Sequence, residues 1–302
     1  MTEKTVQVGE RLAVSYDITN RGQSDGEQTV ELWLGGEVVD SEALVLDTGE
    51  KDRMSLVTDA FTDEDDGQLY EVEIVTEDRV ARVMTVEVTT IPDSVELYVN
   101  ALESFDESDE GTTVSTWPDT LGNFDLTGGN PEVVASGVNG QRSVLFRDSP
   151  EDILSNTSVS LSGPFTIIGL FRRRESDNSS SREVAGSNAT NSRLKQGTGD
   201  SNRIEDDNRD NIIDGSATAQ EDILMSGIFD GSDSKIREDG VQTASGSLST
   251  TTLDGFDIGR ATIFDDFFGD AGAFAVYSDN LEKTGEIDSE EQRIADSYGY
   301  TI

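Results

Sequence analysis

The sequence predicts an all-β protein of two sandwich domains that ends in a short helix. Short runs of Val, Ile, Leu and Phe alternate with polar residues at the period of two expected of half-buried strands. Clusters of Gly, Asp and Asn separate these runs, as turns between strands do. A short linker at residues 89–93, which carries Pro92, divides the strand-rich sequence into domains that we place at residues 1–90 and 91–302.

The first domain shows the strongest alternation. Apolar residues at every second position predict strands within residues 12–18, 30–34, 70–74 and 80–86. Gly35-Gly36 supplies a two-residue hairpin turn after the second of these strands. Six or seven strands at this spacing, over about 90 residues, fit an immunoglobulin-like sandwich.

Three segments of this domain carry a resemblance to a known family. They are Val8-Gly9-Glu10, residues 14–22, which end in Asn20-Arg21-Gly22, and Glu31-Leu32-Trp33-Leu34. A strand that ends in Asn-x-Gly, followed by an extended strand and a two-glycine hairpin, resembles a CARDB-type cell-adhesion-related domain. The resemblance covers most of the first domain and implies a spacer or an assembly unit.

The second domain carries a series of landmarks whose order resembles a laminin-G-like or concanavalin A-like jelly-roll sandwich. They are residues 97–101, Trp117-Pro118-Asp119 followed by Gly122-Asn123, and residues 137–146, 163–168, 224–241, 256–260 and 268–277. The resemblance spans most of the domain and implies a glycan- or protein-binding head. Residues 175–220, rich in Ser, Asn, Asp and Arg, are predicted to be long polar loops that join short strands at the rim of the sandwich.

The chain contains 62 acidic and 22 basic residues, a net charge of −40, and has neither His nor Cys. Self-repulsion of this size is tolerable where salt screens it, since the Debye length falls to about 3 Å at molar salt. Residues 1–90 carry a net charge of −15 and residues 91–302 a net charge of −25. The charge therefore covers both domains and predicts adaptation to a hypersaline environment. The alternating pattern argues against the alternative of an acidic disordered chain.

The composition excludes several functions. Without Cys there are no disulfides, catalytic thiolates or zinc-thiolate sites, and without His there is no Ser-His-Asp triad. The negative charge would repel a phosphate backbone, so nucleic acid is not an expected partner. Apolar runs are too short for a membrane span, and residues 1–10 lack the apolar core of a secretory signal.

One carboxylate motif resembles a catalytic site. Residues 286–291, Glu-Ile-Asp-Ser-Glu-Glu, have the E-x-D-x-x-E spacing of glucanases built on the same sandwich, in which the carboxylates lie on a strand. Here the alternation of a strand is missing, and Ile287, Ile294 and Tyr298 are spaced for one buried helix face. We therefore predict a helix near residues 289–298, with Asp288 or Ser289 as its N-cap, and no catalytic residue.

Calcium is the candidate cofactor. Laminin-G-like domains often hold Ca²⁺ near one rim, and Ca²⁺ binds six to eight oxygen ligands. Asp206, Asp207, Asp210 and Asp214 lie in one polar segment that can supply such ligands. Because about one residue in five is acidic, composition alone also produces such clusters, and this second explanation is favoured.

The run Arg172-Arg173-Arg174 is unusual in so acidic a chain and is the candidate interface site. One interpretation is a patch that pairs with the carboxylates of a partner, because the guanidinium group binds carboxylates bidentately. Pairing with carboxylates of the same chain is the alternative and is favoured.

Two tryptophans and three sequons have both structural and functional interpretations. Trp33 and Trp117 can stack on a sugar ring, but Trp117 occupies a landmark that is usually core, so packing is favoured. The N-glycosylation sequon, a frequent chance match in a chain rich in Asn, Ser and Thr, occurs at Asn156, Asn178 and Asn188.

The sequence supports three functional hypotheses. The first is a non-enzymatic structural protein on the surface of a virus particle that infects a halophilic archaeon, as a capsid turret, decoration or fibre. Its first domain would assemble it as a homo-oligomer with other virion proteins, and its lectin-like second domain would contact host glycans or the S-layer. The second is a secreted or cell-surface adhesin of a haloarchaeon. The third, disfavoured by the misplaced carboxylate motif, is a glycan-cleaving enzyme.

Overall fold

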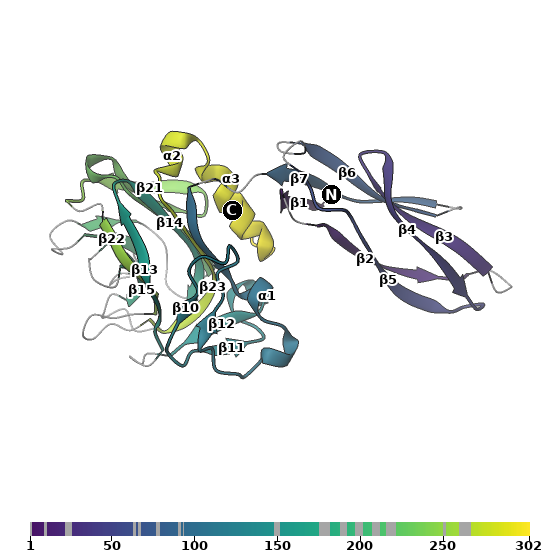
Figure 1. Ribbon diagram of the computed structural model, residues 1–302, viewed down its shortest axis with the longest axis horizontal. Helices are drawn as coiled ribbons and strands as arrows, with labels where there is room; N and C mark the ends of the chain where they lie inside the picture. Colours follow the sequence, from purple (N-terminus) through teal and green to yellow (C-terminus); the bar gives the residue numbers. More distant parts are fainter. Residues whose placement is uncertain are drawn as a thin grey trace. The chain divides into compact units, whose positions relative to one another are not determined.

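The computed structural model describes most of the chain, with short gaps in its loops. The described residues are 2–8, 11–21, 26–62, 65, 68–76, 79–89, 92, 94–147, 152–174, 182–187, 192–196, 202–206, 212–215, 222–249, 252–259 and 267–302. The chain divides into two compact units, Met1–Pro92 and Asp93–Ile302. Within the described residues both units consist mainly of strands, which confirms the all-β prediction (Figure 1).

The smaller unit is an immunoglobulin-like sandwich. Its strands are β1 (Thr2–Gln7), β2 (Ala13–Thr19), β3 (Gly26–Leu34), β4 (Glu37–Leu46), β5 (Lys51–Val57), β6 (Leu69–Thr76) and β7 (Arg79–Thr89). One sheet has the order β1-β7-β6-β3-β4, and β2 pairs with β5 in the second. All these pairings are antiparallel except that of β1 with β7.

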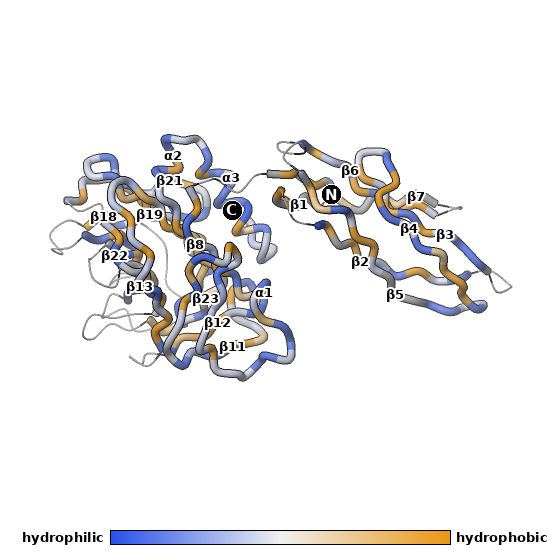
Figure 2. Tube along the Cα trace, in the orientation of Figure 1, coloured by the Kyte–Doolittle hydropathy of each residue, from blue (hydrophilic) through white to orange (hydrophobic). Residues whose placement is uncertain are grey.

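The alternating side chains of the smaller unit build its core. Leu12, Val14, Leu32 and Val72 are buried, and hydrophobic and hydrophilic positions alternate along the strands (Figure 2). The hairpin turn between β3 and β4 lies at Gly35-Gly36, where both residues have positive φ, as a two-residue turn of this kind requires. The predicted strands of this unit are therefore confirmed, and β4 is the strand that follows the predicted hairpin turn, whereas no predicted strand corresponds to β1 or β5.

The larger unit is a jelly-roll sandwich of two sheets. In the described part of the chain, the first sheet contains β18 (Ile212–Asp214), β17 (Asn202–Glu205), β16 (Arg193–Gln196), β15 (Arg182–Gly186), β22 (Thr252–Ile258), β13 (Leu154–Ser162), β10 (Leu126–Thr127) and β9 (Thr116–Trp117), in this order. The second contains β11 (Glu132–Val134), β12 (Ser143–Phe146), β23 (Gly269–Tyr277), β14 (Phe165–Arg173), β19 (Asp222–Phe229), β20 (Ser234–Glu238) and β21 (Val241–Gly246), and β8 (Val95–Asn100) pairs with β23.

The two sheets enclose the main core. Trp117 and Phe256 from the first sheet and Phe274 from the second belong to one buried cluster. The sheets approach closely where β19 carries Gly227, because a Cβ atom there would lie 2.4 Å from Cδ2 of Leu194 on β16. Glycine at this position therefore sets the distance at which the layers pack.

Residues 175–220, predicted to be long polar loops that join short strands, contain four short strands, β15 to β18, among their described residues. These strands form one end of the first sheet. Leu194 and Ile204 face the core, and the charged residues beside them occupy the opposite face of the strands.

A short helix covers the outer face of the second sheet. Helix α3 (Ile287–Ser297) buries Ile287, Ile294 and Ala295 against a second hydrophobic cluster that includes Leu170 of β14 and Leu224 of β19. The other helical segments are α1 (Ala101–Ser104), α2 (Leu281–Thr284) and the 3₁₀ turns η2 (Glu107–Asp109), η3 (Val138–Gly140) and η5 (Gly231–Asp233).

The predicted helix is confirmed but its predicted N-cap is wrong. The N-cap is Glu286, not Asp288 or Ser289, and the Ser289 hydroxyl donates to the Glu286 carbonyl oxygen at 2.8 Å. Gly285, with φ of 85°, ends α2 just before the Glu286 N-cap of α3. Ile287, the first residue of α3, is buried. The helix therefore begins two residues before the predicted start at residue 289, and its first residue, Ile287, belongs to the buried cluster.

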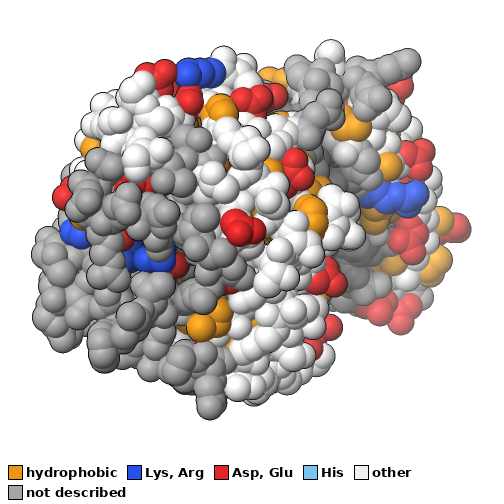
Figure 3. Space-filling view, turned by 60° about the vertical axis from the view of Figure 1, so that its left-hand side comes forward, with side chains coloured by type: hydrophobic (Ala, Val, Ile, Leu, Met, Phe, Trp, Pro, Cys, Tyr) orange, Lys and Arg blue, Asp and Glu red, His pale blue; other side chains and the backbone are white. Residues whose placement is uncertain are grey.

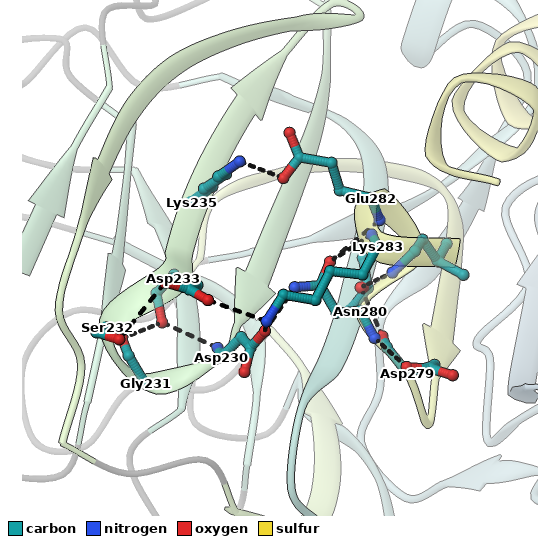
Figure 4. Close-up of polar contacts among 12 residues, drawn as sticks. Asp230, Gly231, Ser232, Asp233, Lys235, Asp279, Asn280, Glu282 and Lys283 are labelled. Atoms are coloured by element: carbon teal, nitrogen blue, oxygen red, sulfur yellow. Dashed lines mark hydrogen bonds and ion pairs between the residues drawn. The ribbon is translucent and has the colours of Figure 1, made fainter. Parts of the chain in front are cut away.

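A polar cluster joins α2 to the connection between β19 and β20 (Figure 4). Lys283 Nζ lies 2.6 Å from Asp230 Oδ2 and 3.0 Å from Asp233 Oδ2. Hydrogen bonds to these two carboxylates raise the pKa of Lys283 to about 12. Asn280 caps α2 and also donates to Asp230, so the helix and the strand connection are held by shared partners.

Acidic side chains are spread over the visible face of the molecule among the residues shown in colour (Figure 3). We expect the thermal midpoint to fall by about 5–10 °C when salt is lowered from about 3 M to 0.1 M, because screening weakens. Scanning calorimetry at several NaCl concentrations measures this shift. A midpoint that does not change over this range would contradict salt adaptation.

Candidate functional site

A polar cleft of about 410 Å³ lies near the β9 end of the first sheet of the larger unit. One side consists of Gly122, Asn123, Asp125 and Thr127, from the loop before β10 and from β10 itself. The other side consists of the four consecutive residues of β13 from Ser155 to Ser158. All eight residues belong to the described part of the chain.

The loop side of the cleft is held in place by one buried carboxylate. Asp119 is only 4% exposed, and its two oxygens accept four backbone N–H groups. Oδ1 accepts from Tyr98 at 2.9 Å and from Leu121 at 3.1 Å. Oδ2 accepts from Asn123 at 3.0 Å and from Phe124 at 2.9 Å. The carboxylate therefore fixes the backbone that presents Asn123 and Asp125 to the cleft.

The strand side of the cleft contains a β-bulge. The pairing of β13 with β22 changes register between Asn156 and Ser160. Within this irregular segment the backbone N–H of Ser158 donates to Asn156 Oδ1 at 2.7 Å. A bulge bends the strand and redirects its side chains, and bulges are frequent next to binding sites. It aims Thr157 and Ser158, both exposed, into the space beside β10.

One hydrogen bond connects the two sides. Asn156 Nδ2 donates to the backbone carbonyl oxygen of Asp125 at 2.9 Å. Asp125 Oδ1 in turn accepts from the backbone N–H of Asp119 at 3.0 Å. The cleft is thus braced across its width by contacts that join residues about 30 positions apart in the sequence.

The chemistry of the cleft is that of a hydrogen-bonding surface. Four of its residues supply hydroxyl groups, two supply amides and Asp125 supplies a carboxylate, so donors and acceptors are mixed. Asp125 is the one ionisable side chain among these eight lining residues. The lining therefore lacks the pair of carboxylates that glycoside hydrolysis generally uses.

The candidate calcium ligands do not come together in the described residues. Asp206 is buried, and its Oδ2 accepts from the N–H and the hydroxyl of Ser249, both at 2.6 Å. Asp214 Oδ1 lies 3.1 Å from Arg203 Nε. Asp207 and Asp210 lie outside the described residues. Within the part of the chain that is described, no group of three or more acidic side chains is arranged to hold a metal ion.

The three arginines at the end of β14 form contacts within the chain. Arg172 Nη2 lies 2.6 Å from Asp222 Oδ2, and Arg174 Nε lies 2.7 Å from Asp270 Oδ2. Burial raises the pKa of the Asp270 carboxyl, and its bond to Arg174 acts in the opposite direction. Arg173 is fully buried. Intramolecular pairing of Arg172 and Arg174 is therefore present, and a partner-facing role for the run stays a prediction.

The carboxylates of the glucanase-like motif lie at and near the start of helix α3. Arg237 of β20 forms ion pairs with Asp288 at 2.5 Å and with Glu291 at 2.9 Å. Glu286 accepts from the Thr284 hydroxyl at 2.5 Å. Asp288 and Glu291 therefore attach the helix to the second sheet, and the three carboxylates do not lie on a strand.

The structure describes both tryptophans but only one of the three sequon asparagines. Trp117 is fully buried, which confirms packing, and its ring lies 6.4 Å from that of Phe105. Trp33 donates its ring N–H to Glu31 at 2.9 Å. Asn156 lies in the cleft, whereas Asn178 and Asn188 lie outside the described residues.

The cleft was not among the sites predicted from the sequence. Two features of the sequence nevertheless lie in the segments that form it. The Trp-x-Asp landmark followed by Gly-Asn contains Asp119 and Asn123, and the sequon at Asn156 covers three of the four strand residues. Their meeting depends on the pairing of β10 with β13 and on the bulge, neither of which the sequence pattern reveals.

No family model and no curated protein sequence matches this chain. Among solved structures, the binding domain of botulinum neurotoxin DC in complex with SialylT is similar at 13% identity, with a TM-score of 0.50 and coverage of 68% of this chain and 52% of that one. Trypanosoma rangeli sialidase is similar at 12% identity, with a TM-score of 0.49 and coverage of 94% and 53%.

Domain 4 of AbnA, a GH43 extracellular arabinanase from Geobacillus stearothermophilus in complex with arabinotriose, is similar at 14% identity, with a TM-score of 0.46 and coverage of 68% and 98%. This chain spans a third to a half of the length of the sialidase chains it matches. The likeness to the neurotoxin domain agrees with the β-sandwich fold. At such identities it establishes the fold alone.

Proposed function

We propose that this protein is a non-enzymatic adhesion protein whose larger unit binds carbohydrate in the polar cleft. The observation that carries the proposal is the braced cleft itself, with hydroxyl, amide and carboxylate groups on both of its sides. Sugars present hydroxyl groups that both donate and accept hydrogen bonds. A lining of mixed donors and acceptors is complementary to such a ligand.

Rigidity supports this function. The loop side is held by the four N–H groups bound to Asp119. On the strand side, Ser155 and Asn156 are paired with β22, and the N–H of Ser158 in the bulge donates to Asn156. A site that is already ordered loses little conformational freedom when a ligand binds, which favours affinity. The similarity of fold to a neurotoxin binding domain described in complex with SialylT is consistent with carbohydrate binding on this type of sandwich.

We expect Asn123→Ala to weaken carbohydrate binding about three- to tenfold, the loss of one hydrogen bond. The Asn123 side chain lines the cleft and is exposed, while its backbone N–H is the group that binds Asp119. Titration calorimetry at high salt, with glycans first identified on an array, measures the change. Gln242→Ala is the matched control, since Gln242 is an exposed amide on β21 that does not line the cleft. Equal affinities of the two variants would contradict this site.

The setting that we propose is the surface of a virus particle that infects a halophilic archaeon, as a capsid turret, decoration or fibre. The net charge of −40 supports a hypersaline environment, and the immunoglobulin-like smaller unit is suited to assembly with other virion proteins or with further copies of this chain. Host glycans or an S-layer would be the ligands. No helix in the described part of the chain is long and apolar enough to cross a membrane.

The alternative setting is the surface of a haloarchaeal cell, where the same protein would act as an adhesin. Antibodies raised against the larger unit distinguish the two settings by electron microscopy. Labelling of purified virus particles would support the virion, and labelling of the envelope of uninfected cells would support the cellular adhesin. Binding of the purified protein to host cells at high salt tests the ligand in either case.

A further inference from the structure

We infer that the cleft selects neutral, hydroxyl-rich sugars over anionic glycans, and that Asp125 determines this selectivity. The inference rests on the proposed carbohydrate binding and adds the class of ligand. Among the eight lining residues there is one carboxylate, that of Asp125, and no lysine or arginine.

Recognition of an anionic sugar requires a counter-charge, which the cleft does not offer. Carboxylate and sulfate groups are bound in proteins by arginine, lysine or clustered backbone N–H groups. The backbone N–H groups of Asn123 and Phe124 already donate to Asp119, and that of Ser158 donates to Asn156. These three backbone donors are therefore used to build the cleft, and the side-chain donors that remain in its lining are neutral hydroxyl and amide groups.

The Asp125 carboxylate is placed to interact with the ligand. Asp125 is exposed, and its Oδ1 accepts from the Asp119 N–H, which fixes the position of the side chain. Oδ2 makes no protein hydrogen bond among the described residues and can accept from a sugar hydroxyl. A carboxylate acceptor forms stronger hydrogen bonds with hydroxyl donors than a neutral acceptor does, whereas it repels an anionic substituent.

The surroundings reinforce this preference. Residues 91–302 carry a net charge of −25, so an anionic glycan approaches a negative surface. High salt screens the distant charges, since the Debye length is about 3 Å at molar concentration, but groups in contact inside a cleft are screened much less. Discrimination at high salt should therefore depend on Asp125 more than on the rest of the surface.

The test compares methyl glycosides of glucose, galactose and mannose with the corresponding uronates, which differ only in carrying a carboxylate at C6. Affinities are measured on the full chain by NMR titration at high salt, with the amide signals of residues 122–127 and 155–158 reporting on the cleft. We expect the neutral member of a pair that binds to do so about five- to tenfold more tightly. Asp125→Asn should reduce that ratio to about two or less, because the amide keeps an acceptor for the Asp119 N–H but removes the charge.

Glu110→Gln serves as the matched control, because it removes one exposed carboxylate from the same unit without touching the cleft. It should leave the ratio unchanged. Uronates that bind as tightly as the neutral sugars, or a ratio unaffected by Asp125→Asn, would overturn the selectivity while leaving carbohydrate binding intact. If neither class moves the cleft signals, and a wider glycan array gives no binding, the proposed function itself fails and the inference with it.

Discussion

Replacing Arg293 with Met should lower the free energy of unfolding of the larger unit by about 3–5 kcal/mol. Arg293 is 7% exposed and Glu290 is 1% exposed, and both lie on the face of α3 that packs against the second sheet. Arg293 Nη2 donates to Glu290 Oε2 at 2.9 Å. Removal of the arginine leaves a buried carboxylate without its counter-charge, which is among the most costly single changes in a protein interior.

Two tyrosines extend this pair into a network. The Tyr277 hydroxyl donates to Glu290 Oε2 at 2.5 Å, and the guanidinium of Arg293 lies 4.3 Å from the centre of the Tyr98 ring. Burial raises the pKa of Tyr277 well above its usual value, so the phenol stays protonated and remains a donor to Glu290. The network attaches α3 to β8 and β23, the strands that carry Tyr98 and Tyr277.

Urea denaturation at constant high salt measures the free energy of unfolding that Arg293→Met removes, and two further variants serve as controls. The exposed Lys283→Met should shift the midpoint much less, because Lys283 and its partner Asp233 are each 57% exposed, and its other partner, Asp230, keeps the hydrogen bond from Asn280. The double variant Arg293→Met with Glu290→Leu should recover a large part of the lost stability, since an apolar pair needs no counter-charge. A single variant that costs less than about 1 kcal/mol, or a double variant as unstable as the single, would contradict this account.

The strands that the sequence predicted best are those with one buried and one exposed face. In β2 and β6, apolar residues at every second position face the core of the smaller unit. Strand β16, Arg193-Leu194-Lys195-Gln196, supplies a single apolar residue to the core, so no periodic signal arises over so short a segment. Its charged residues are buried and paired across strands, Lys195 with Glu205 at 3.1 Å. In the sequence, such residues are indistinguishable from those of a polar loop.

The candidate site was harder to predict than the fold, because it is assembled from distant segments. Asn156 and Asp125 meet only after β10 has paired with β13, and the bulge that directs Thr157 and Ser158 has no sequence signature of its own. The calcium and arginine hypotheses relied on clusters that are contiguous in the sequence. Those of their members that the structure describes lie in separate intramolecular pairs, such as Asp214 with Arg203 and Arg174 with Asp270.

Asp119→Asn should destabilise the larger unit by about 2–4 kcal/mol and reduce carbohydrate binding more than tenfold. The Asp119 carboxylate accepts two backbone N–H groups on each oxygen. An asparagine replaces one oxygen with an NH₂ group, which would face two N–H donors and satisfy neither. Each buried donor left without an acceptor costs about 1–3 kcal/mol, so either orientation of the amide is unfavourable.

The effect on binding follows from the position of the loop. If the amide turns its NH₂ group toward Asn123 and Phe124, the backbone that presents Asn123 to the cleft loses both of its bonds to residue 119. If it turns toward Tyr98 and Leu121, the loop loses its attachment to β8 instead. Hydrogen exchange of these four amides shows which pair is released, and the released pair should exchange faster in the variant.

Asp125→Asn is the matched control for this substitution, six residues away in the same loop. Its single bond from the Asp119 N–H to Oδ1 can be retained by an amide oxygen, so the stability should change by less than about 1 kcal/mol. Asp119→Asn and Asp125→Asn remove the same charge, and a difference between them therefore reports the four N–H bonds. If the two variants unfold at the same urea concentration, the loop must be held mainly by its other contacts, and the cleft would not depend on Asp119 for its shape.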